Sequence, residues 1–526
     1  MSSESAESPD PRRPNLLLII TDQQRADHVG FGGNEILRTP NLDALAARGT
    51  RFDRCYVANP ICMPNRCSIL TGRVPTAHGV IFNDRSLAWT ANTFVRVLRN
   101  AGYQTGLIGK SHIQHGLSAR DAPALDQEPA LGDPYSPGWD TWEHPERYER
   151  GPVEVPDNFY GFGHVEFAIG HGDVVGGHHL RWALEQGGDL DALGGDWGQE
   201  RPARTRYEDW WQVYQPTVPE SLYSTTFVTE QSVAWIEKAA GASEPWFLQC
   251  SYPDPHHPFT PPGEWWNAYD PEQMPVSETF DDPLEAAPRH LRAIRALEPG
   301  QNPVQMFGPT RDQVRHARAA EYGMLEMVDQ GIGRVLAALE RSGAANDTIV
   351  IFTSDHGDMF GDHGLMLKGW MHYQGCLRVP LVIARPGQPS AETRSLVSSL
   401  DLAQTVLDLC DLGPYAGMQG TSLRPVLEDP AASVRDHVYI EDDFPNHARM
   451  PLLPARTRTL LTDEGRISRY STGELELFDL ENDPQELTNL ADQARGRDRR
   501  FHLGERLADA LLEYSDISRP GALAGS

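Results

Sequence analysis

The sequence predicts an α/β protein: a large, mixed and mostly parallel β-sheet flanked by helices, followed by a smaller C-terminal antiparallel α+β domain. Three observations support this prediction. Short apolar segments alternate with helical patterns up to residue 430, which is typical of a parallel sheet covered on both faces. From residue 431 the pattern changes to short strands and one final helix. The chain of 526 residues is long enough to bury a core in both parts.

Four apolar segments are the predicted parallel strands, and polar residues follow each of them. The strands are expected at residues 15–21, 105–108, 246–251 and 348–353. The polar residues that follow them include Asp22, Lys110 and His112, His256 and His257, and Asp355 and His356. Because ligands bind at the carboxyl ends of the strands in open α/β sheets, this shared placement predicts an active site at that edge.

Helical patterns connect the strands. Helices are expected at residues 41–48, 93–101, 226–240, 312–342 and 396–412. In the first of them, Thr39 is the predicted N-cap and Pro40 the first helical residue. The C-terminal part is expected to contain strands at residues 437–442, 457–462, 466–470 and 474–480, and a helix at residues 498–514.

These elements predict the domain organisation. Residues 1–13 are polar and are expected to be a disordered tail, residues 14–430 form the catalytic domain, and residues 431–526 form the C-terminal α+β subdomain. Within the large domain, residues 115–225 are rich in Gly, His and Trp and have weak periodicity. This segment is expected to run over the site, either as a lid or as a structural insertion.

Charge and cysteine content exclude several classes of protein. The chain has 46 Lys and Arg against 74 Asp and Glu, a net charge of −28, which argues against nucleic acid or an anionic membrane as a partner. Six Cys are too few for a disulfide scaffold in a chain of this length. The N-terminal apolar stretch, residues 16–20, is too short for a signal peptide or a membrane span, so a cytoplasmic protein is expected.

Lysine is rare in this chain, although arginine is frequent. It occurs only at positions 110, 238 and 368. The pKa of a lysine can fall far enough for it to release a proton, whereas an arginine stays charged. The three lysines are therefore either groups kept for chemistry or surface lysines that remain by chance.

The segment around Cys62 is the most specific motif. Pro64 suits the first turn of a helix that ends at Gly72, so Cys62 is expected just ahead of a helix N-terminus, where an anion is favoured. Arg66 lies close enough in sequence to bind the oxygens of such an anion. A buried structural cysteine and a thiolate nucleophile are both compatible with this pattern. The spacing to Arg66 does not match a C-x5-R phosphatase loop, and the cysteine spacing does not favour zinc.

The motif Cys62-x-Pro64-x-Arg66, followed by Leu-Thr-Gly-Arg at 70–73, resembles the signature of the type I, formylglycine-dependent sulfatases. This family belongs to the alkaline phosphatase-like superfamily, and the chain also resembles the phosphonate monoester hydrolase branch. Further matches follow in order along most of the chain: NLLLIITDQQ, TPNLDALAARGTRF, GYQTGLIGKSH, PHHPF, TSDHGD, RVPL and ELELFDLENDPQELTNLA. The resemblance implies an alkaline phosphatase-like large sheet and a smaller four-stranded one.

The resemblance also implies a cofactor and a modified residue. Cys62 would be oxidised to formylglycine (3-oxoalanine) by a formylglycine-generating enzyme, and its hydrate would attack sulfur and leave a sulfated hemiacetal. One divalent metal ion is implied, with Asp22, Gln23, residue 62, Asp355 and His356 as ligands. Many sulfatases have Asp-Asp and Asp-Asn at the two ligand pairs and bind Ca²⁺. The imidazole in this chain suits Mn²⁺, which we favour, or Fe or Zn better than Ca²⁺.

The implied catalytic residues lie in the same motifs. Lys110 binds sulfate and residue 62, and His112 is the base that breaks down the hemiacetal. His256 and Lys368 bind the bridging oxygen and protonate the leaving group. Asn83 matches a substrate-binding Asn of the phosphonate-hydrolase branch. Asn65 departs from the motif, because it replaces the usual Ser or Ala. Structural roles are expected for His257, His363, Asp358 and Arg378.

The expected function is hydrolysis of a small sulfate monoester, aryl or alkyl. The alternative is a phosphonate monoester or phosphodiester hydrolase with the same nucleophile, or activity toward both classes. Lys110 and His112 favour the sulfatase, because the other branch has uncharged hydroxyl residues there, whereas the metal pairs resemble that other branch. A non-catalytic oxyanion-binding module is the third interpretation, if Cys62 stays a thiol. A homo-oligomer is a further expectation from the resemblance.

Overall fold

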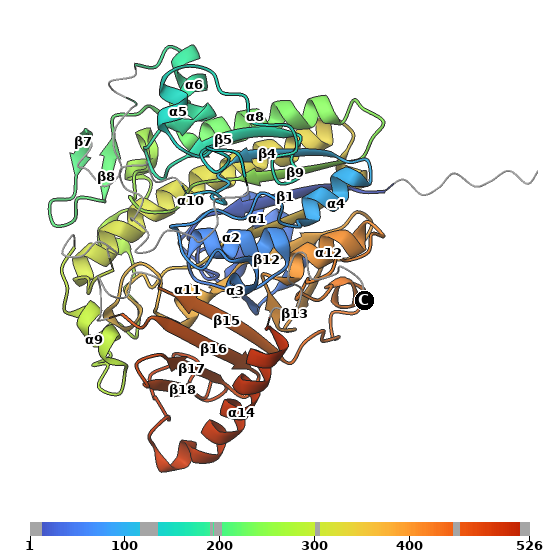
Figure 1. The fold of residues 1–526 in the computed structure, drawn as a ribbon. Coiled ribbons are helices and arrows are strands. Elements are labelled where there is room, and N and C mark those ends of the chain that lie inside the picture. Colours follow the sequence, from blue (N-terminus) through green and yellow to red (C-terminus); the bar gives the residue numbers. More distant parts are fainter. Residues whose placement is uncertain are drawn as a thin grey trace, which may run out of the picture.

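A nine-stranded mixed sheet forms the centre of the molecule (Figure 1). The computed structural model describes residues 13–115, 135–189, 193, 202–299, 306–444 and 453–515. The strands follow in the order β13 (Ala391–Thr393), β2 (Thr50–Phe52), β12 (Leu381–Ala384), β10 (Thr348–Ser354), β1 (Asn15–Thr21), β9 (Trp246–Ser251), β4 (Gln104–Gly109), β5 (His164–Ile169) and β6 (Gly176–Gly177). The five central strands, from β10 to β5, are parallel, whereas β12 and β6 pair antiparallel to their inner neighbours.

Helices cover both faces of this sheet, because the central strands are apolar on both sides. Leu16 and Leu18 of β1 pack into one core with α2 (Cys62–Thr71), α4 (Phe94–Asn100) and α12 (Asp401–Leu409). Leu17 and Ile19 pack into the other core with α1 (Pro40–Ala46), α8 (Ser224–Ala239) and α10 (Arg311–Arg341). Successive side chains of a strand point to opposite faces, so one apolar strand supplies both cores.

A second, four-stranded antiparallel sheet lies beside the large domain. It consists of β15 (His437–Asp443), β16 (Arg456–Thr462), β17 (Arg466–Tyr470) and β18 (Leu475–Phe478), and α14 (Arg497–Glu513) packs on it. β15 is the edge strand, and it faces the large domain (Figure 1). Its Glu441 amide donates to Ala58 O at 3.0 Å, so the two parts are joined along this edge.

The remaining helices and strands are short. The helices are α3 (Pro75–His78), α5 (Glu146–Glu149), α6 (His178–Glu185), α9 (Arg289–Arg295), α11 (Gln374–Leu377) and α13 (Arg424–Glu428). The strands are β3 (Cys55–Tyr56), β7 (Ala203–Arg206), β8 (Tyr214–Pro216), β11 (Arg378–Val379) and β14 (Val397–Ser398). Among the described residues, we find no helix with both the length and the apolar character that crossing a membrane requires.

The predicted fold class is confirmed, with β1, β9, β4 and β10 at the predicted strands. One local expectation was wrong. Residues 396–412 are not one helix but β14 followed by α12. Thr39 is the N-cap of α1 and Pro40 its first residue, as predicted, although the Thr39 hydroxyl accepts from the Gly30 amide at 2.8 Å and not from the helix. Within the segment expected to be a lid or a structural insertion, residues 164–177 extend the large sheet as β5 and β6.

Candidate active site

Polar side chains from five neighbouring parallel strands meet at the carboxyl edge of the large sheet. They follow directly, or within a few residues, after β1, β10, β9, β4 and β5: Asp22, Asp355 and His356, His256, Lys110, and His171. All of them are buried. The edge predicted from the sequence is therefore where these charged groups converge.

Cys62 is the first residue of α2, whose N-terminus points into this edge. Ile61 is the N-cap, Pro64 lies in the first turn, and Gly72 ends the helix with φ +64°. The unpaired amide groups of a helix N-terminus and the helix dipole favour negative charge beside Cys62. Asn65 fixes the helix to its surroundings, since its amide group donates to Asp355 O at 2.5 Å and accepts from Ala58 N at 3.0 Å.

The Cys62 sulfur is surrounded by charged groups. His356 Nε2 lies 3.1 Å away, Lys368 Nζ 3.2 Å and Asp22 Oδ1 3.7 Å. Burial and the Asp22 carboxylate oppose ionisation of the thiol, but Lys110 and Lys368 hold its pKa well below the ordinary value. The two lysines therefore give Cys62 surroundings that favour a thiolate, unlike those of an inert structural cysteine.

Four of the predicted metal ligands form one buried group. One donor atom from each of Asp22, Cys62, Asp355 and His356 lies within 4.8 Å of the others. Although burial lowers it, the Asp355 carboxylate raises the pKa of His356 to about 9. Gln23 lies beside this group in a left-handed conformation with φ 67°, and its amide oxygen accepts from Lys368 Nζ at 2.9 Å. Two carboxylates and an imidazole are donors that suit a divalent transition metal.

Arg66 and Lys110 neutralise the two carboxylates. Arg66 Nε donates to Asp355 Oδ2 at 2.6 Å, and its NH1 group donates to Lys110 O and Ser251 Oγ. Lys110 Nζ contacts Asp22 Oδ2. Burial alone would raise the pKa of Asp22, but the Lys110 ammonium holds it well below its ordinary value. Arg66 is therefore engaged with a carboxylate, whereas the sequence led us to expect it on oxyanion oxygens.

His171 belongs to the site, although the sequence analysis did not select it. Its Nε2 atom contacts Lys110 Nζ and lies 3.5 Å from Asp22 Oδ2. Its ring stacks on His256 with centroids 3.6 Å apart and an interplanar angle of 11°. The available signal was the apolar half of residues 164–169, which is β5. A strand there would have placed His171 at the carboxyl edge.

His112 follows β4 and lies near His171, with ring centroids 6.2 Å apart. Its backbone has φ 54°, and its amide donates to Glu143 Oε2 at 2.6 Å. Burial and the Lys110 charge lower the pKa of His112 to about 3, although the neighbouring Cys62 opposes this shift, so the imidazole is neutral near pH 7.

The other predicted residues lie around this centre. Asn83 Oδ1 accepts from the Met63 amide at 3.2 Å, so the Asn83 side chain contacts the first turn of α2. His257 Nδ1 lies 3.1 Å from Gln23 Oε1, and Asp358 accepts from Gln23 Nε2 at 2.7 Å. His363 pairs with Asp282 at 2.7 Å, so the metal ligands are not its partner.

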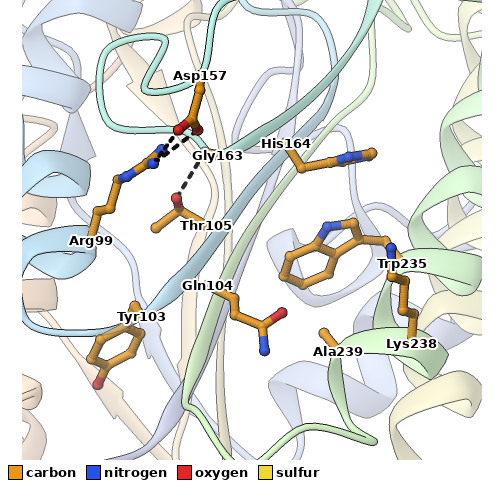
Figure 2. Close-up of a pocket in the computed structure, with 10 residues that line it drawn as sticks. All are labelled: Arg99, Tyr103, Gln104, Thr105, Asp157, Gly163, His164, Trp235, Lys238 and Ala239. Atoms are coloured by element: carbon orange, nitrogen blue, oxygen red, sulfur yellow. Dashed lines mark hydrogen bonds and ion pairs between the residues drawn. The ribbon is translucent and has the colours of Figure 1, made fainter.

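The third lysine lies elsewhere. Lys238 lines a surface cleft of about 410 Å³ with Trp235, Gln104 and His164 (Figure 2). Gln104 and His164 are the first residues of β4 and β5, so this cleft is at the amino edge of the sheet. Two of the three lysines therefore lie at the candidate active site and one does not.

Comparison with known protein families agrees with this geometry. A family model described as Sulfatase matches residues 14–150 and 171–412. A second model, described as N-sulphoglucosamine sulphohydrolase, C-terminal, matches residues 361–514. The two models together span the large domain and the four-stranded sheet.

Individual proteins are similar over nearly the whole chain. An arylsulfatase of Clostridium perfringens (strain 13 / Type A) is 29% identical over 519 residues, which cover 95% of this chain and 94% of its own. A choline-sulfatase of Rhizobium meliloti (strain 1021) is 29% identical over 499 residues, with 92% and 83% covered. The crystal structure of a phosphonate monoester hydrolase of Agrobacterium radiobacter aligns with a TM-score of 0.76 and 26% identity, covering 96% of both chains.

Proposed function

The chain belongs to the sulfatase family, and we propose that it hydrolyses a small aryl or alkyl sulfate monoester with a formylglycine formed from Cys62. The family matches identify a sulfatase in general terms, while the substrate class and the modified nucleophile are our proposal. The observation that carries it is the position of Cys62 at a helix N-terminus, between a buried metal-ligand group and two lysines. The oxidised, hydrated side chain supplies the attacking hydroxyl and a second hydroxyl for release of sulfate.

The surrounding residues bind the sulfate group and move protons. Lys110 and Lys368 place positive charge on two sides of residue 62, where charge develops on the sulfate oxygens. Lys368 and His256 face the bridging oxygen and protonate the departing alcohol. By resemblance to the family, His112, whose imidazole is neutral near pH 7, takes the proton whose removal expels sulfate.

A divalent metal ion fits this donor set. Asp22, Gln23, residue 62, Asp355 and His356 would hold it, and the buried carboxylates and imidazole suit Mn²⁺ better than Ca²⁺. When bound, such an ion supplies Lewis-acid charge to the nucleophile and the sulfate. Arg66 keeps the Asp355 carboxylate oriented for this role through its 2.6 Å hydrogen bond.

A phosphonate monoester hydrolase with the same nucleophile is the second candidate. It is favoured by the similarity to the phosphonate monoester hydrolase structure and by the Asp-Gln and Asp-His pairs. Lys110 favours the sulfatase, because its ammonium group is buried at the position where the other branch has a hydroxyl residue. In a Lys110→Ser/His112→Ser variant, we therefore expect the rate on sulfate esters to fall more than the rate on phosphonate esters.

The first experiment measures the mass of the tryptic peptide of residues 55–66, from protein produced with a formylglycine-generating enzyme. We expect the aldehyde at residue 62 and an intact thiol at Cys55, which lies outside the Cys-x-Pro-x-Arg motif and so serves as an internal control. Rates on 4-nitrophenyl sulfate and an aryl phosphonate monoester are then compared. Two intact thiols in inactive protein would contradict the proposed nucleophile and favour an oxyanion-binding module.

A further inference from the structure

The free edge of β15 holds the turn that leads into Cys62. The Glu441 amide donates to Ala58 O at 3.0 Å, and Glu441 O accepts from Asn59 Nδ2 at 2.6 Å. Asn59 Oδ1 in turn accepts from the Ile61 amide at 2.8 Å. One residue of the small sheet therefore fixes the chain directly before the nucleophile.

The Glu441 carboxylate holds the other side of α2. It accepts from both the amide and the hydroxyl of Thr76, each at 2.8 Å. Thr76 belongs to α3, which follows α2 in sequence. Glu441 is buried, so these bonds do not compete with bulk water. The segments directly before and after the helix that carries Cys62 are thus held by the same residue.

The next residue of β15, Asp442, contacts a different loop. Successive side chains of a strand point to opposite sides, and Asp442 Oδ2 accepts from the Trp370 amide at 2.8 Å. Asp442 is fully buried and also lies 3.4 Å from His372 Nε2. His372 is fixed to the neighbouring strand by a 2.7 Å hydrogen bond to Thr459.

The loop that Asp442 contacts carries Lys368, and the residues on both sides of Lys368 have left-handed backbone conformations. Leu367, Gly369 and Trp370 have φ values of 72°, 86° and 37°. Non-glycine residues persist in this region only where their surroundings hold them. On the N-terminal side the loop is held by Asp358, whose Oδ1 accepts from the Leu367 amide at 3.1 Å. On the C-terminal side Asp442 is the corresponding acceptor.

We infer that Asp442 is a positioning residue for Lys368. Through Asp442 and its neighbour Glu441, the edge of the small sheet fixes the loop of the leaving-group lysine and the turn of the nucleophile relative to each other. The 3.2 Å separation of Lys368 Nζ from Cys62 Sγ depends on this shared attachment. The inference rests on the proposed function, in which Lys368 protonates the departing alcohol.

The test compares leaving groups in an Asp442→Ala variant of the full chain carrying formylglycine. For sulfate esters of poorly acidic alcohols we expect kcat/KM to fall about 10- to 100-fold, because a small misplacement of a catalytic group costs that much. For 4-nitrophenyl sulfate, whose leaving group needs little protonation, we expect less than about a threefold loss. Lys368→Ala should show the same pattern more strongly. In the Lys368→Ala background, Asp442→Ala should add little further loss.

Two further variants separate positioning from general stability. Asp443→Ala removes a buried carboxylate of the same strand, which pairs with Arg458 and not with the loop, so it should leave the leaving-group dependence unchanged. Asp442→Asn keeps an oxygen that can accept from the Trp370 amide, so it should show the leaving-group dependence of the wild type. If Asp442→Ala does not fold, Asp442→Ser is measured in the same way. An equal loss across all leaving groups, or a changed dependence in Asp443→Ala, would overturn the inference.

Hydrogen exchange provides a readout that does not need activity. In Asp442→Ala, exchange of the peptide of residues 366–373 should become at least about tenfold faster, and it should not change in Asp443→Ala. If the wild-type protein does not hydrolyse sulfate esters, the proposed function fails, and the leaving-group series is run on aryl phosphonate esters. Unchanged exchange in Asp442→Ala would refute the positioning role by itself.

Discussion

The two edges of the large sheet carry the same types of charged side chain in different environments. At the carboxyl edge, Lys110 is 4% exposed and contacts Asp22, which is fully buried. At the amino edge, Arg99 pairs with Asp157 at 2.8 Å, but their side chains are 29% and 78% exposed (Figure 2). Water screens the second pair, whereas buried charges act strongly on whatever binds beside them. The same residue types therefore support chemistry only where several strand ends bury them together.

The largest effect that would test this comparison is expected from the nucleophile. Cys62→Ala should reduce kcat/KM for the best sulfate ester by about 10⁴-fold or more, since the covalent step is lost. Cys410→Ala is the matched control, because that buried thiol packs in the same core as Tyr103, which lines the amino-edge cleft. The control should keep activity within about twofold. Measurable turnover by Cys62→Ala near the wild-type rate would contradict the assignment of the site.

Removal of the metal tests the buried ligand group. Exhaustive chelation should lower activity by about 10³-fold, because the charge that stabilises the nucleophile and the sulfate is lost. Addition of Mn²⁺ should restore more activity than addition of Ca²⁺, with bound metal quantified by mass spectrometry of the elements. Equal recovery with Ca²⁺ would show that His356 does not decide metal preference.

Two lysines give a direct comparison of the edges. Lys110→Ala should lower kcat/KM by about 10²- to 10³-fold, the usual effect of losing one group that stabilises charge in a buried site. Lys238→Ala, in the amino-edge cleft, should change it by less than about twofold. Steady-state kinetics on one sulfate ester measure both. A large loss in Lys238→Ala would mean that the second cleft contributes to turnover.

The smallest expected effect is on the pH dependence of stability, and it comes from a buried imidazole that lies at neither edge of the sheet. His179 is buried, and its burial lowers its pKa to about 4 although it hydrogen-bonds to Leu222 O at 2.8 Å. Below pH 6.5 the His179 imidazole is protonated in the unfolded chain but stays neutral in the folded chain. The free energy of unfolding therefore falls as the pH drops toward 4. From pH 8 to 5.5 this contributes about 1.4 kcal/mol to the loss in free energy of unfolding.

Urea unfolding at the two pH values checks this prediction. His179→Gln keeps a hydrogen-bond donor but has no group that titrates, so its stability should change less between pH 8 and 5.5 than that of the wild type. An identical pH dependence in both proteins would mean that His179 is protonated in the folded state.

The sequence was informative where structure depends on local pattern. The apolar segments identified β1, β9, β4 and β10, and parallel pairing brings their carboxyl ends together, so Asp22, Lys110 and Asp355 could be grouped in advance. β5 was missed because two of its six residues are polar and only two are buried, as expected for a strand near the rim of the sheet. His171 was missed with it.

Partners that depend on tertiary packing could not be predicted. The hydrogen bond from Arg66 to Asp355 joins α2 to the residue after β10, almost 300 positions later. No local sequence pattern predicts this bond. The same holds for the bond between Asp442, in β15 of the small sheet, and Trp370, in a loop of the large domain. Sequence pattern specifies which residues reach an edge, while long-range contacts decide what each of them binds there.

The burial of α2 has a consequence for the order of events in biosynthesis. Every residue of this helix, from Cys62 to Thr71, is buried in the folded chain. An enzyme that must enclose this segment to oxidise Cys62 can reach it only before the chain folds around it. If Cys62 is converted to formylglycine as proposed, maturation and folding compete in time, and the fraction of active molecules reflects which is faster. Slower folding during synthesis should yield a more completely converted protein.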